Sequence, residues 1–554
     1  MMGHLSDYTD SSDTTPEWAH LIEPENFYAR LAVVRQELFK DDEFAELYCL
    51  DNGRPSLPPA LMALVQLLQF HDNTSDDETA ERVRFDLRWK YALGVSLHYA
   101  GFDDSSLCNF RKRLQKHGRE RAAFDKTVLI GRATGLLPPN AAELIDSAPL
   151  RGAGAVKDSY QLIRNAVRKL LEAMGYKNPQ RRKHLTPALQ PYLTERGKPQ
   201  IDWDDPAARQ ALLKQLVDDA RASLQLSQGF AVSTPPNGPA DETVPGWVAV
   251  LTKIVGDDVV TDDRGQPQLR QGVAPDRIIS ATDPEMRHGR KSAARRFNGY
   301  KLSVAEADAS ELIANVDILA GNAADGADIK ALVDEQAEPY DLTPERVTGD
   351  HAYGTGDNHA AFAEAQIDLV APVSDPRSAE LFSKSAFQID LAKGEVTCPA
   401  EHTTQSYTWV KDDRGRRVKR FDFGRTRCQD CPLRTRCTTA TKTGRTVTLH
   451  HHESHLQRMR ERQRTEEFKT LYRRRPRIER KLAELLYHGL RRARYVGRAK
   501  TKFQALWTAA AVNCKRLFKL LVDAPACLLE VLKQISRRQV AAASARIQAR
   551  VAIN

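Results

Sequence analysis

Glu479 is the first candidate for chemistry, because it lies inside an intensely basic stretch. Between Arg473 and Lys502 there are twelve Lys and Arg residues against two Glu. Such a surface attracts polyphosphate, and an acid within it opposes that attraction unless it holds a cation. Divalent cations shared by carboxylates clamp the scissile phosphate in many nucleases and polymerases. The alternative is a surface glutamate paired with Arg475 or Lys481 at helical spacing.

Two aspartates stand in a context that suits such a metal site. Asp350 follows the apolar segment RVTG, and Asp146 follows ELI at what we interpret as the end of a strand. Ligands bind at the carboxyl ends of strands in open α/β sheets, so both acids are candidates to share metals with Glu479. A helix-capping role is the alternative for Asp350. The separations, 350 − 146 = 204 and 479 − 350 = 129 residues, mean that only a fold can unite the three.

Asp283 is the second choice, after Asp146, for the acid that would share metals with Asp350 and Glu479. It lies in SATDPEMRHGRKS, ahead of a basic loop in which Arg290 and Lys291 are predicted to bind the DNA backbone.

A cysteine cluster, consisting of Cys398, Cys428, Cys431 and Cys437, indicates a second kind of metal site. Four thiolates satisfy a closed tetrahedral zinc, and the C-x2-C step is typical of a zinc knuckle. His402 is an alternative ligand, and a metal-free loop is the other interpretation. Arginines flank the cluster, which favours a basic insertion that faces DNA. The other four cysteines are scattered through the chain.

The length, charge and hydropathy of the whole chain restrict these hypotheses. With 554 residues it is too long for one core, and its net charge of +9 is concentrated after residue 410. The polar, acidic start has no signal-peptide pattern and no apolar run reaches the length of a membrane span, so we expect a cytoplasmic protein without a membrane partner.

Helical periodicity dominates residues 58–137. In SSLCNFRKRLQKHG, the basic residues Arg111, Lys112 and Arg113 are predicted to face a DNA groove, opposite an apolar face. An ordinary solvated basic face is the alternative. Residues 158–230 are again helical. Strands are then expected at RIISATD, FNGYKLSVAEAD, LIANVDILAG, RVTGDHAYG and DLVAPV, with helices between the later ones, which predicts a mixed α/β sheet.

Four segments together resemble a known family. They are ELIDSAPLRGAGAVKDSY, DPEMRHGRKSAARRFNGYKL, RVTGDHAYG and LYRRRPRIERKLAELLYHGLRRARYVG. The chain resembles the DDE transposases of bacterial insertion sequences, in the branch with a helical N-terminal domain and a ribonuclease-H-like core. The resemblance places the catalytic acids at Asp146, Asp350 and Glu479, each a ligand of the divalent cations.

The family's Tyr-x2-Arg-x3-Glu-x6-Lys signature matches at Tyr472, Arg475 and Glu479, and departs at the lysine, where Leu486 stands. Lys481, His488 or Arg491 is the substitute to consider. Pro476 favours the first turn of a helix and would place Tyr472 and Arg475 on the preceding segment. We predict DNA contacts at Tyr472, Arg475, Arg491 and Arg494.

The resemblance implies an α/β catalytic core with an all-α N-terminal domain, a helical insertion and a small zinc-binding insertion. The predicted division is a helical DNA-binding domain at 1–137, the core at 138–157 and 276–390, a helical insertion and linker at 158–275, a zinc module at 391–445, the rest of the core with the Glu helix at 446–520, and a helical tail at 521–554.

The implied function is binding of the terminal inverted repeats and metal-dependent cleavage and strand transfer into target DNA. Two Mg2+ or Mn2+ ions per active site and one structural zinc are the expected metals, and a homodimer on paired ends is the expected assembly. The alternatives are a structure-selective nuclease on the same core and a non-catalytic DNA-binding protein derived from a transposase.

Overall fold

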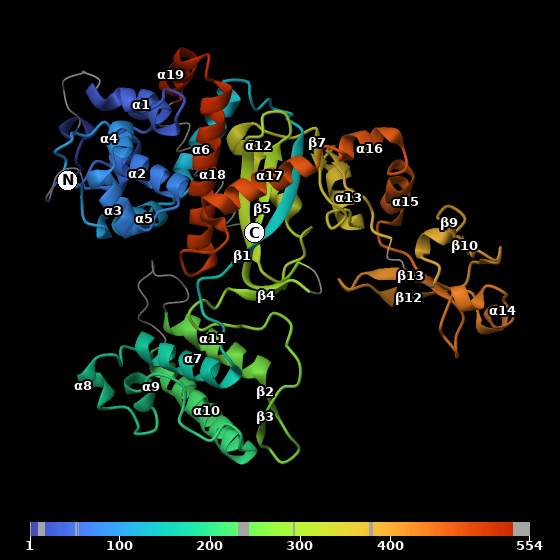
Figure 1. Cartoon of the computed structure of the whole chain (residues 1–554). Coiled ribbons are helices and arrows are strands. Elements are labelled where there is room, and N and C mark those ends of the chain that lie inside the picture. The colour runs from blue at the N-terminus through green and yellow to red at the C-terminus, as the bar shows by residue number, and fades with distance from the viewer. Residues whose placement is uncertain are drawn as a thin grey trace.

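The computed structural model describes residues 2–8, 17–49, 53, 55–230, 243–291, 294–375 and 381–535. Most of the predicted linker at 227–246 and the end of the predicted tail lie outside these ranges. Figure 1 shows a helical N-terminal region beside a central sheet, a helical lobe beneath the sheet and a thin arm on the far side.

A mixed six-stranded sheet forms the centre of the molecule. Its order is β4-β5-β1-β7-β8, with β6 paired to β5. β5 runs antiparallel to β1, β4 and β6, whereas β7 runs parallel to β1 and β8 runs parallel to β7. The strands are β1 (Glu143–Arg151), β4 (Arg287–Arg290), β5 (Arg296–Ala307), β6 (Ile313–Ala320), β7 (Arg346–Thr348) and β8 (Asp368–Val370).

The parallel strands are connected through helices, as the alternating sequence pattern predicts. α12 (Ile329–Tyr340) precedes β7, and α13 (Gly356–Glu364) lies between β7 and β8. The expected strand at 277–283 is wrong, because the described backbone there is irregular. Its apolar residues are buried for another reason: Ile279 packs in the core of the sheet and Ile278 in the core of the helical lobe.

The N-terminal helices pack onto the sheet through one hydrophobic core. α2 is buried over nearly its whole length, and that core also contains residues of β5, β6 and α18. The prediction of a helical N-terminal region beside an α/β core is therefore confirmed. The helices are α1 (Phe27–Leu38), α2 (Pro59–Asp72), α3 (Asp76–Phe85), α4 (Leu87–Leu93), α5 (Ser105–Lys116) and α6 (Ala122–Ala133).

The helical lobe and the arm have their own hydrophobic cores. The lobe contains α7 (Ser159–Ala173), α8 (Pro179–Arg182), α9 (Pro191–Thr194), α10 (Pro206–Ser227), α11 (Val244–Asp258) and the hairpin of β2 (Val259–Thr261) and β3 (Pro267–Leu269). The arm, residues 381–449, contains β9 (Gln388–Asp390), β10 (Glu395–Thr397), β11 (Thr403–Thr404), β12 (Tyr407–Lys411), β13 (Arg417–Asp422), α14 (Arg425–Gln429) and β14 (Thr446–Thr448). The exact domain boundaries stay a prediction.

After the arm the chain returns to the sheet. α17 crosses the sheet and α18 stands between it and the N-terminal helices (Figure 1). Among the described helices, none combines the length and apolar character needed to span a bilayer. The elements are α15 (Glu453–Arg462), α16 (Glu466–Tyr472), α17 (Pro476–Leu485), a π-helical turn (Leu486–Leu490), α18 (Arg498–Leu520) and α19 (Pro525–Gln534).

Candidate active site

The sheet brings Asp146 and Asp350 together through the register of its two parallel strands. Leu144 of β1 pairs with Thr348 of β7, and each aspartate lies two positions beyond its strand's member of that pair. Neighbouring strands are about 4.8 Å apart, so the two carboxylates share one edge of the β1–β7 pair. The predicted strand-end position of Asp146 is wrong in detail. β1 continues to Arg151 because β5 still pairs with it after β7 has ended.

Glu479 joins these aspartates through an arginine. Arg475 Nη1 donates to Glu479 Oε1 at 2.8 Å, and Arg475 Nη2 donates to Asp146 Oδ2 at 2.7 Å. The predicted surface pair of Glu479 and Arg475 therefore exists, but the same guanidinium also binds an acid 329 positions away. We call Asp146, Asp350 and Glu479 the acid cluster.

The electrostatics of the acid cluster follow from burial and mutual repulsion. Burial raises the pKa of Asp146, and the charge of Asp350 raises it further, whereas the Arg475 guanidinium opposes both effects. The pKa of Tyr472 is also raised, first by burial and then by the charges of Asp350 and Asp146 against the opposing effect of Arg475. All three acids of the cluster therefore act on one small region around Arg475.

Local contacts hold α17 where Glu479 meets the sheet. Pro476 occupies the first turn of the helix, so Arg475 and Tyr472 precede it, as the proline predicts. Ile478 and Leu485 are fully buried against the sheet, and burying such a side chain stabilises by roughly 1.5–3 kcal/mol. Together with Leu482 and the half-buried Leu486 they form the predicted apolar stripe.

Asp283 lies apart from the acid cluster. Its Oδ1 accepts a hydrogen bond from the Tyr300 hydroxyl at 2.5 Å. Tyr300 pairs with Leu150 along β1, whereas Asp146 pairs with Val304. Four positions along a strand span roughly 13 Å, so Asp283 is buried below the other end of β1.

The donor set of the acid cluster fits a divalent cation, since carboxylate oxygens are the ligands that Mg2+ and Mn2+ prefer. In the geometry of the described residues, no group of three or more His, Cys, Asp or Glu side chains is placed to hold a metal ion. A guanidinium lies between two of the carboxylates instead.

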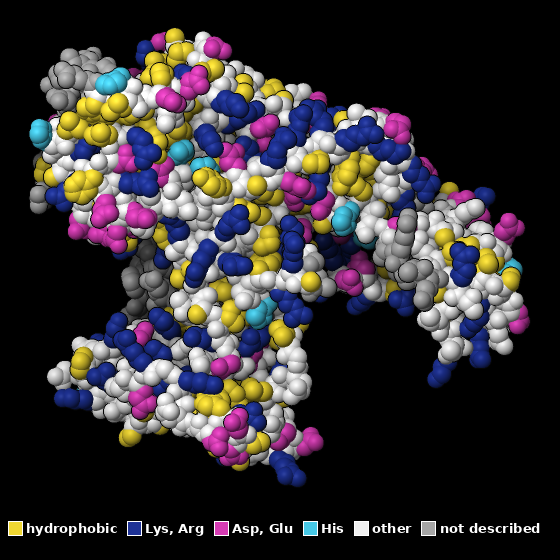
Figure 2. Space-filling model, viewed as in Figure 1, with side chains coloured by type: hydrophobic (Ala, Val, Ile, Leu, Met, Phe, Trp, Pro, Cys, Tyr) yellow, Lys and Arg dark blue, Asp and Glu magenta, His cyan; other side chains and the backbone are white. Residues whose placement is uncertain are grey.

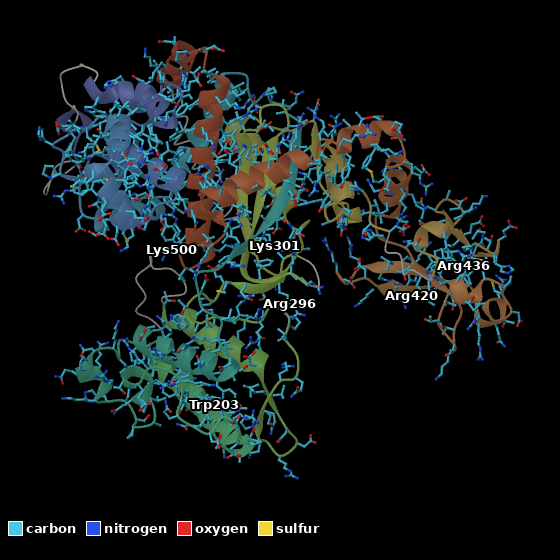
Figure 3. The ribbon with its side chains drawn as sticks, in the orientation of Figure 1. Trp203, Arg296, Lys301, Arg420, Arg436 and Lys500 are labelled. Carbon is cyan, nitrogen blue, oxygen red and sulfur yellow. The ribbon has the colours of Figure 1, made fainter. Side chains whose placement is uncertain are left out.

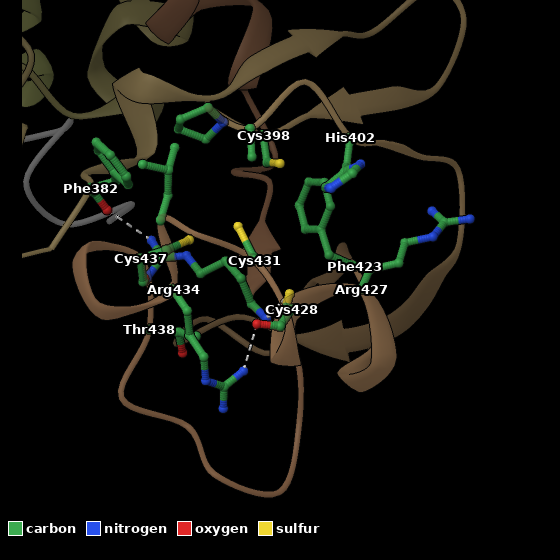
Figure 4. A pocket seen from close by; sticks show the side chains of 14 residues that line it. Phe382, Cys398, His402, Phe423, Arg427, Cys428, Cys431, Arg434, Cys437 and Thr438 are labelled. Carbon is green, nitrogen blue, oxygen red and sulfur yellow. Dashed lines mark hydrogen bonds between the residues drawn. The ribbon is translucent and has the colours of Figure 1, made fainter.

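The cysteine cluster surrounds one small cavity in the arm. Figure 4 shows the four cysteines around the same space, with His402 and Phe423 at its side. The cavity measures about 20 Å³, enough for a single ion or water. Burial raises the pKa of Cys437, and the other three cysteines raise it further. A cation would relieve that repulsion between thiolates, so the residues fit zinc in their chemistry.

Hydrogen bonds from two arginines support the loops that carry the cysteines. The Arg445 N–H donates to Cys428 Sγ at 3.4 Å, and the Arg434 guanidinium donates to the carbonyls of Cys428 and Ala440. Two of the arginines of this segment thus stabilise the loops themselves.

Two family models match the chain. One is described as a transposase DDE domain and matches residues 397–518, which include Glu479 and the cysteine cluster. The other is described as a transposase domain (DUF772) and matches residues 16–113, within the N-terminal helices. Together they indicate a DDE transposase of the insertion-sequence type. No curated protein and no solved structure matches the chain.

The chain presents only some of the predicted DNA contacts to solvent. Lys112, Arg290, Lys291 and Arg491 are exposed, and Arg113 is half-buried over the Tyr48 ring. Figure 2 shows further Lys and Arg side chains over α16 and the start of α17. Figure 3 places Arg296 at the turn between β4 and β5, and Arg420 and Arg436 on the arm.

Besides Arg475, two residues that were predicted to contact DNA are bound to other parts of the protein. Arg111 is 7% exposed because it forms a two-pronged salt bridge with Asp76, so it does not lie on the exposed face of α5. Arg494 donates to the Thr74 carbonyl and to Asn73, which joins the C-terminal region to the end of α2.

Burial and hydrogen bonding also narrow the choice of residue that could substitute for the family's lysine. Lys481 is buried and bonded to Glu484 at 3.1 Å, and His488 is buried with its Nδ1 at 2.5 Å from the His71 carbonyl oxygen. Arg491 is the exposed member of the three candidates.

Sequence reasoning missed two acids that organise the site. Asp308 binds Arg474 at 2.8 Å and Arg477 at 3.1 Å, which fixes the start of α17 to the end of β5. Asp325 accepts hydrogen bonds from Ser147 beside the acid cluster and from Lys301 of β5. The position of Asp308 directly after a long apolar strand was the available signal.

Proposed function

We propose that this transposase binds the ends of its element and catalyses metal-dependent phosphodiester cleavage and strand transfer, with Asp146, Asp350 and Glu479 as its catalytic acids. The observation that carries the proposal is the bridge from Asp146 through Arg475 to Glu479. It links a strand of the sheet to the helix inside the region that matches the DDE domain.

The sheet supports a ribonuclease-H-like core for this chemistry. Three antiparallel strands, β6, β5 and β1, are followed in space by the parallel strands β7 and β8. That topology provides two neighbouring strands, β1 and β7, with Asp146 on β1 and Asp350 in the turn that follows β7. The third acid arrives on a helix that packs on β1.

Divalent cations bound at the acid cluster would lower the pKa of the attacking water and neutralise charge on the phosphate. The protein's part would be to bring three carboxylates from three separate elements toward the region around Arg475. Asp146 is fixed by the sheet, and its Oδ1 accepts the N–H of Ser147 at 2.8 Å. Asp350 accepts the N–H of Ala352 at 2.8 Å, which orients its carboxylate at the start of the turn after β7.

For DNA binding we propose exposed cations on other elements of the chain. Lys112 of α5, Arg290 and Lys291 at the tip of β4, and Arg491 after the π-helical turn are free to meet phosphates from different sides. A dimer that pairs two element ends remains part of the proposal.

For the arm we propose a structural zinc held by Cys398, Cys428, Cys431 and Cys437. The shared cavity supports it, and so does the raised pKa of Cys437, to which burial and the other three cysteines contribute. Zinc would fix the arm's fold and so the orientation of its basic surface toward DNA.

Cleavage and strand transfer by the wild type and by Asp350→Asn test the proposed function. The substrates are duplexes made from the DNA that flanks the gene. We expect the wild type to cut and join with Mg2+, and the variant to bind equally well without cutting. Cutting without joining would favour a structure-selective nuclease. Binding without cutting by the wild type would favour a DNA-binding protein derived from a transposase.

A further inference from the structure

Arg475 occupies the place between two acids where a cation is needed. Its Nη1 and Nη2 bind Glu479 and Asp146 at 2.8 and 2.7 Å, and its side chain is 19% exposed. Its Nε is buried and, within the described part of the chain, has no hydrogen-bond partner. Burial alone would lower the pKa of Arg475, but the three carboxylates outweigh it and raise the pKa. The guanidinium is thus held mainly by the acid cluster.

The backbone around Arg475 does not depend on this contact. Arg474 and Arg477 on either side are tied to Asp308, and Ile478 is fully buried. The side chain of Arg475 can therefore leave the acids while α17 stays on the sheet. A phosphate is a suitable destination, because guanidinium binds phosphate through two parallel hydrogen bonds.

We propose that Arg475 is a resident cation that stabilises the acid cluster in the DNA-free protein and moves to a DNA phosphate when DNA binds, so that metal loading depends on DNA. The inference rests on the proposed function of the acid cluster. Arg475 is in this respect a positioning residue: it acts through Asp146 and Glu479.

The physical reason is competition between like charges. A divalent cation at Asp146 and Glu479 would have to displace the guanidinium or lie beside it, and either costs free energy. Moving Arg475 to phosphate removes that cost. Because coupling between two binding events is reciprocal, DNA should tighten metal binding by the same factor by which metal tightens DNA binding.

The test is Mn2+ binding to the full-length protein, measured by electron paramagnetic resonance of free Mn2+. Four proteins are compared without DNA: wild type, Arg475→Gln, Arg475→Lys and Arg473→Gln. Arg473 is an exposed neighbour in the same basic segment, so its variant controls for the loss of one positive charge. A second series adds a duplex of the flanking DNA, and Asp350→Asn with that duplex gives the background from Mn2+ on DNA.

We expect Arg475→Gln to bind Mn2+ at least about tenfold more tightly than the wild type without DNA. Arg473→Gln and Arg475→Lys should stay close to the wild type, because the first keeps Arg475 and the second keeps a cation there. DNA should tighten Mn2+ binding to the wild type more than to Arg475→Gln.

Equal or weaker Mn2+ binding by Arg475→Gln, beside a wild type that binds Mn2+ with DNA, would overturn the inference and leave the acid cluster as a metal site. If Arg475→Gln does not fold, equal wild-type affinities with and without DNA overturn it. An absence of Mn2+ binding in every protein, with and without DNA, would overturn the proposed function and the inference together.

Discussion

The cysteine cluster and the acid cluster are assembled by opposite routes. All four cysteines lie between residues 398 and 437, whereas the acids come from β1, the turn after β7 and α17. The cysteine cluster belongs to a small arm with its own hydrophobic core, and the acid cluster depends on the register of the central sheet. The cysteine cluster therefore depends on local structure, whereas the acid cluster depends on the whole fold.

Charge is balanced differently in the two clusters. An arginine already lies between two of the acids, so the acid cluster has a cation without any metal. The cysteines face one another, and their mutual repulsion raises the pKa of Cys437 beyond the effect of burial. A fold that depends on metal is therefore expected for the arm and not for the sheet.

The largest effect is expected from a substitution that disrupts only the acid cluster. Asp146→Asn should reduce cleavage of an end duplex by at least about a thousandfold, since the cluster loses one of the ligands that hold its cations, while DNA binding holds. Asp283→Asn is the matched control, because Asp283 is buried elsewhere and bonded to Tyr300. It should alter the melting temperature and leave cleavage within a few-fold. Loss of cleavage in Asp283→Asn with full activity in Asp146→Asn would reverse the assignment.

The second largest effect is expected from substitutions that disrupt only the cysteine cluster. Elemental analysis of chelator-free protein should find about one zinc per chain, and Cys428→Ser with Cys431→Ser should lose it. Structural zinc contributes roughly 10–16 kcal/mol in small peptide modules, so the arm should become sensitive to protease while the melting of the sheet is retained. Cys527→Ser, at an exposed cysteine outside the arm, is the control and should keep its zinc. A zinc-free native protein would exclude the site.

The same contrast explains how much the sequence could predict. Spacing alone pointed to the cysteine cluster, because its members are close in the chain. The apolar stripe on α17, the start of that helix at Pro476 and strands β5 to β8 also followed from local patterns. The position of Asp146 in mid-strand did not, because only its pairing with β5 extends β1 beyond the end of β7.

Arginines were the hardest residues to interpret from sequence. Arg111, Arg491 and Arg494 all lie in basic segments, but the structure exposes only Arg491. The acids and carbonyls that bind the other two come from distant parts of the chain. Whether a cation faces DNA or holds the fold together is therefore decided by tertiary contacts that periodicity does not contain.

A third, smaller effect separates those two kinds of arginine. Arg491→Ala should weaken binding to any DNA sequence and flatten the salt dependence by about 0.9 log units, as expected for one lost phosphate contact. Arg494→Ala should instead lower stability by about 1–2 kcal/mol, because it frees Asn73 and the Thr74 carbonyl. Salt titrations of DNA binding and thermal melts of both variants measure this. An unchanged salt slope in Arg491→Ala would show that it touches no phosphate.

The smallest effect concerns a second buried acid on the strand that carries Asp146. Glu143 is 1% exposed, and its Oε2 accepts a hydrogen bond from Gln336 at 3.3 Å, but no arginine reaches it in the described structure. Burial raises the pKa of Glu143 to about 8, against the opposing effect of that hydrogen bond. A bound proton therefore neutralises the buried carboxyl of Glu143, whereas the Arg475 guanidinium balances the charge of Asp146.

The sign of the resulting pH dependence follows from that raised pKa. Below the ordinary carboxyl pKa of 4.5, Glu143 is protonated in both the folded and the unfolded chain, and its contribution to stability is fully present. Between 4.5 and about 8 the unfolded chain ionises while the folded chain keeps the proton, so stability falls as pH rises through this window. Glu143→Gln keeps the shape and removes the titration. It should raise stability by about 1–2 kcal/mol at the upper end of the window and change little at the lower end. Melting temperatures of both proteins across the window measure the difference. Parallel curves would mean that Glu143 is ionised in the folded protein, and that β1 carries an uncompensated charge in addition to the compensated Asp146.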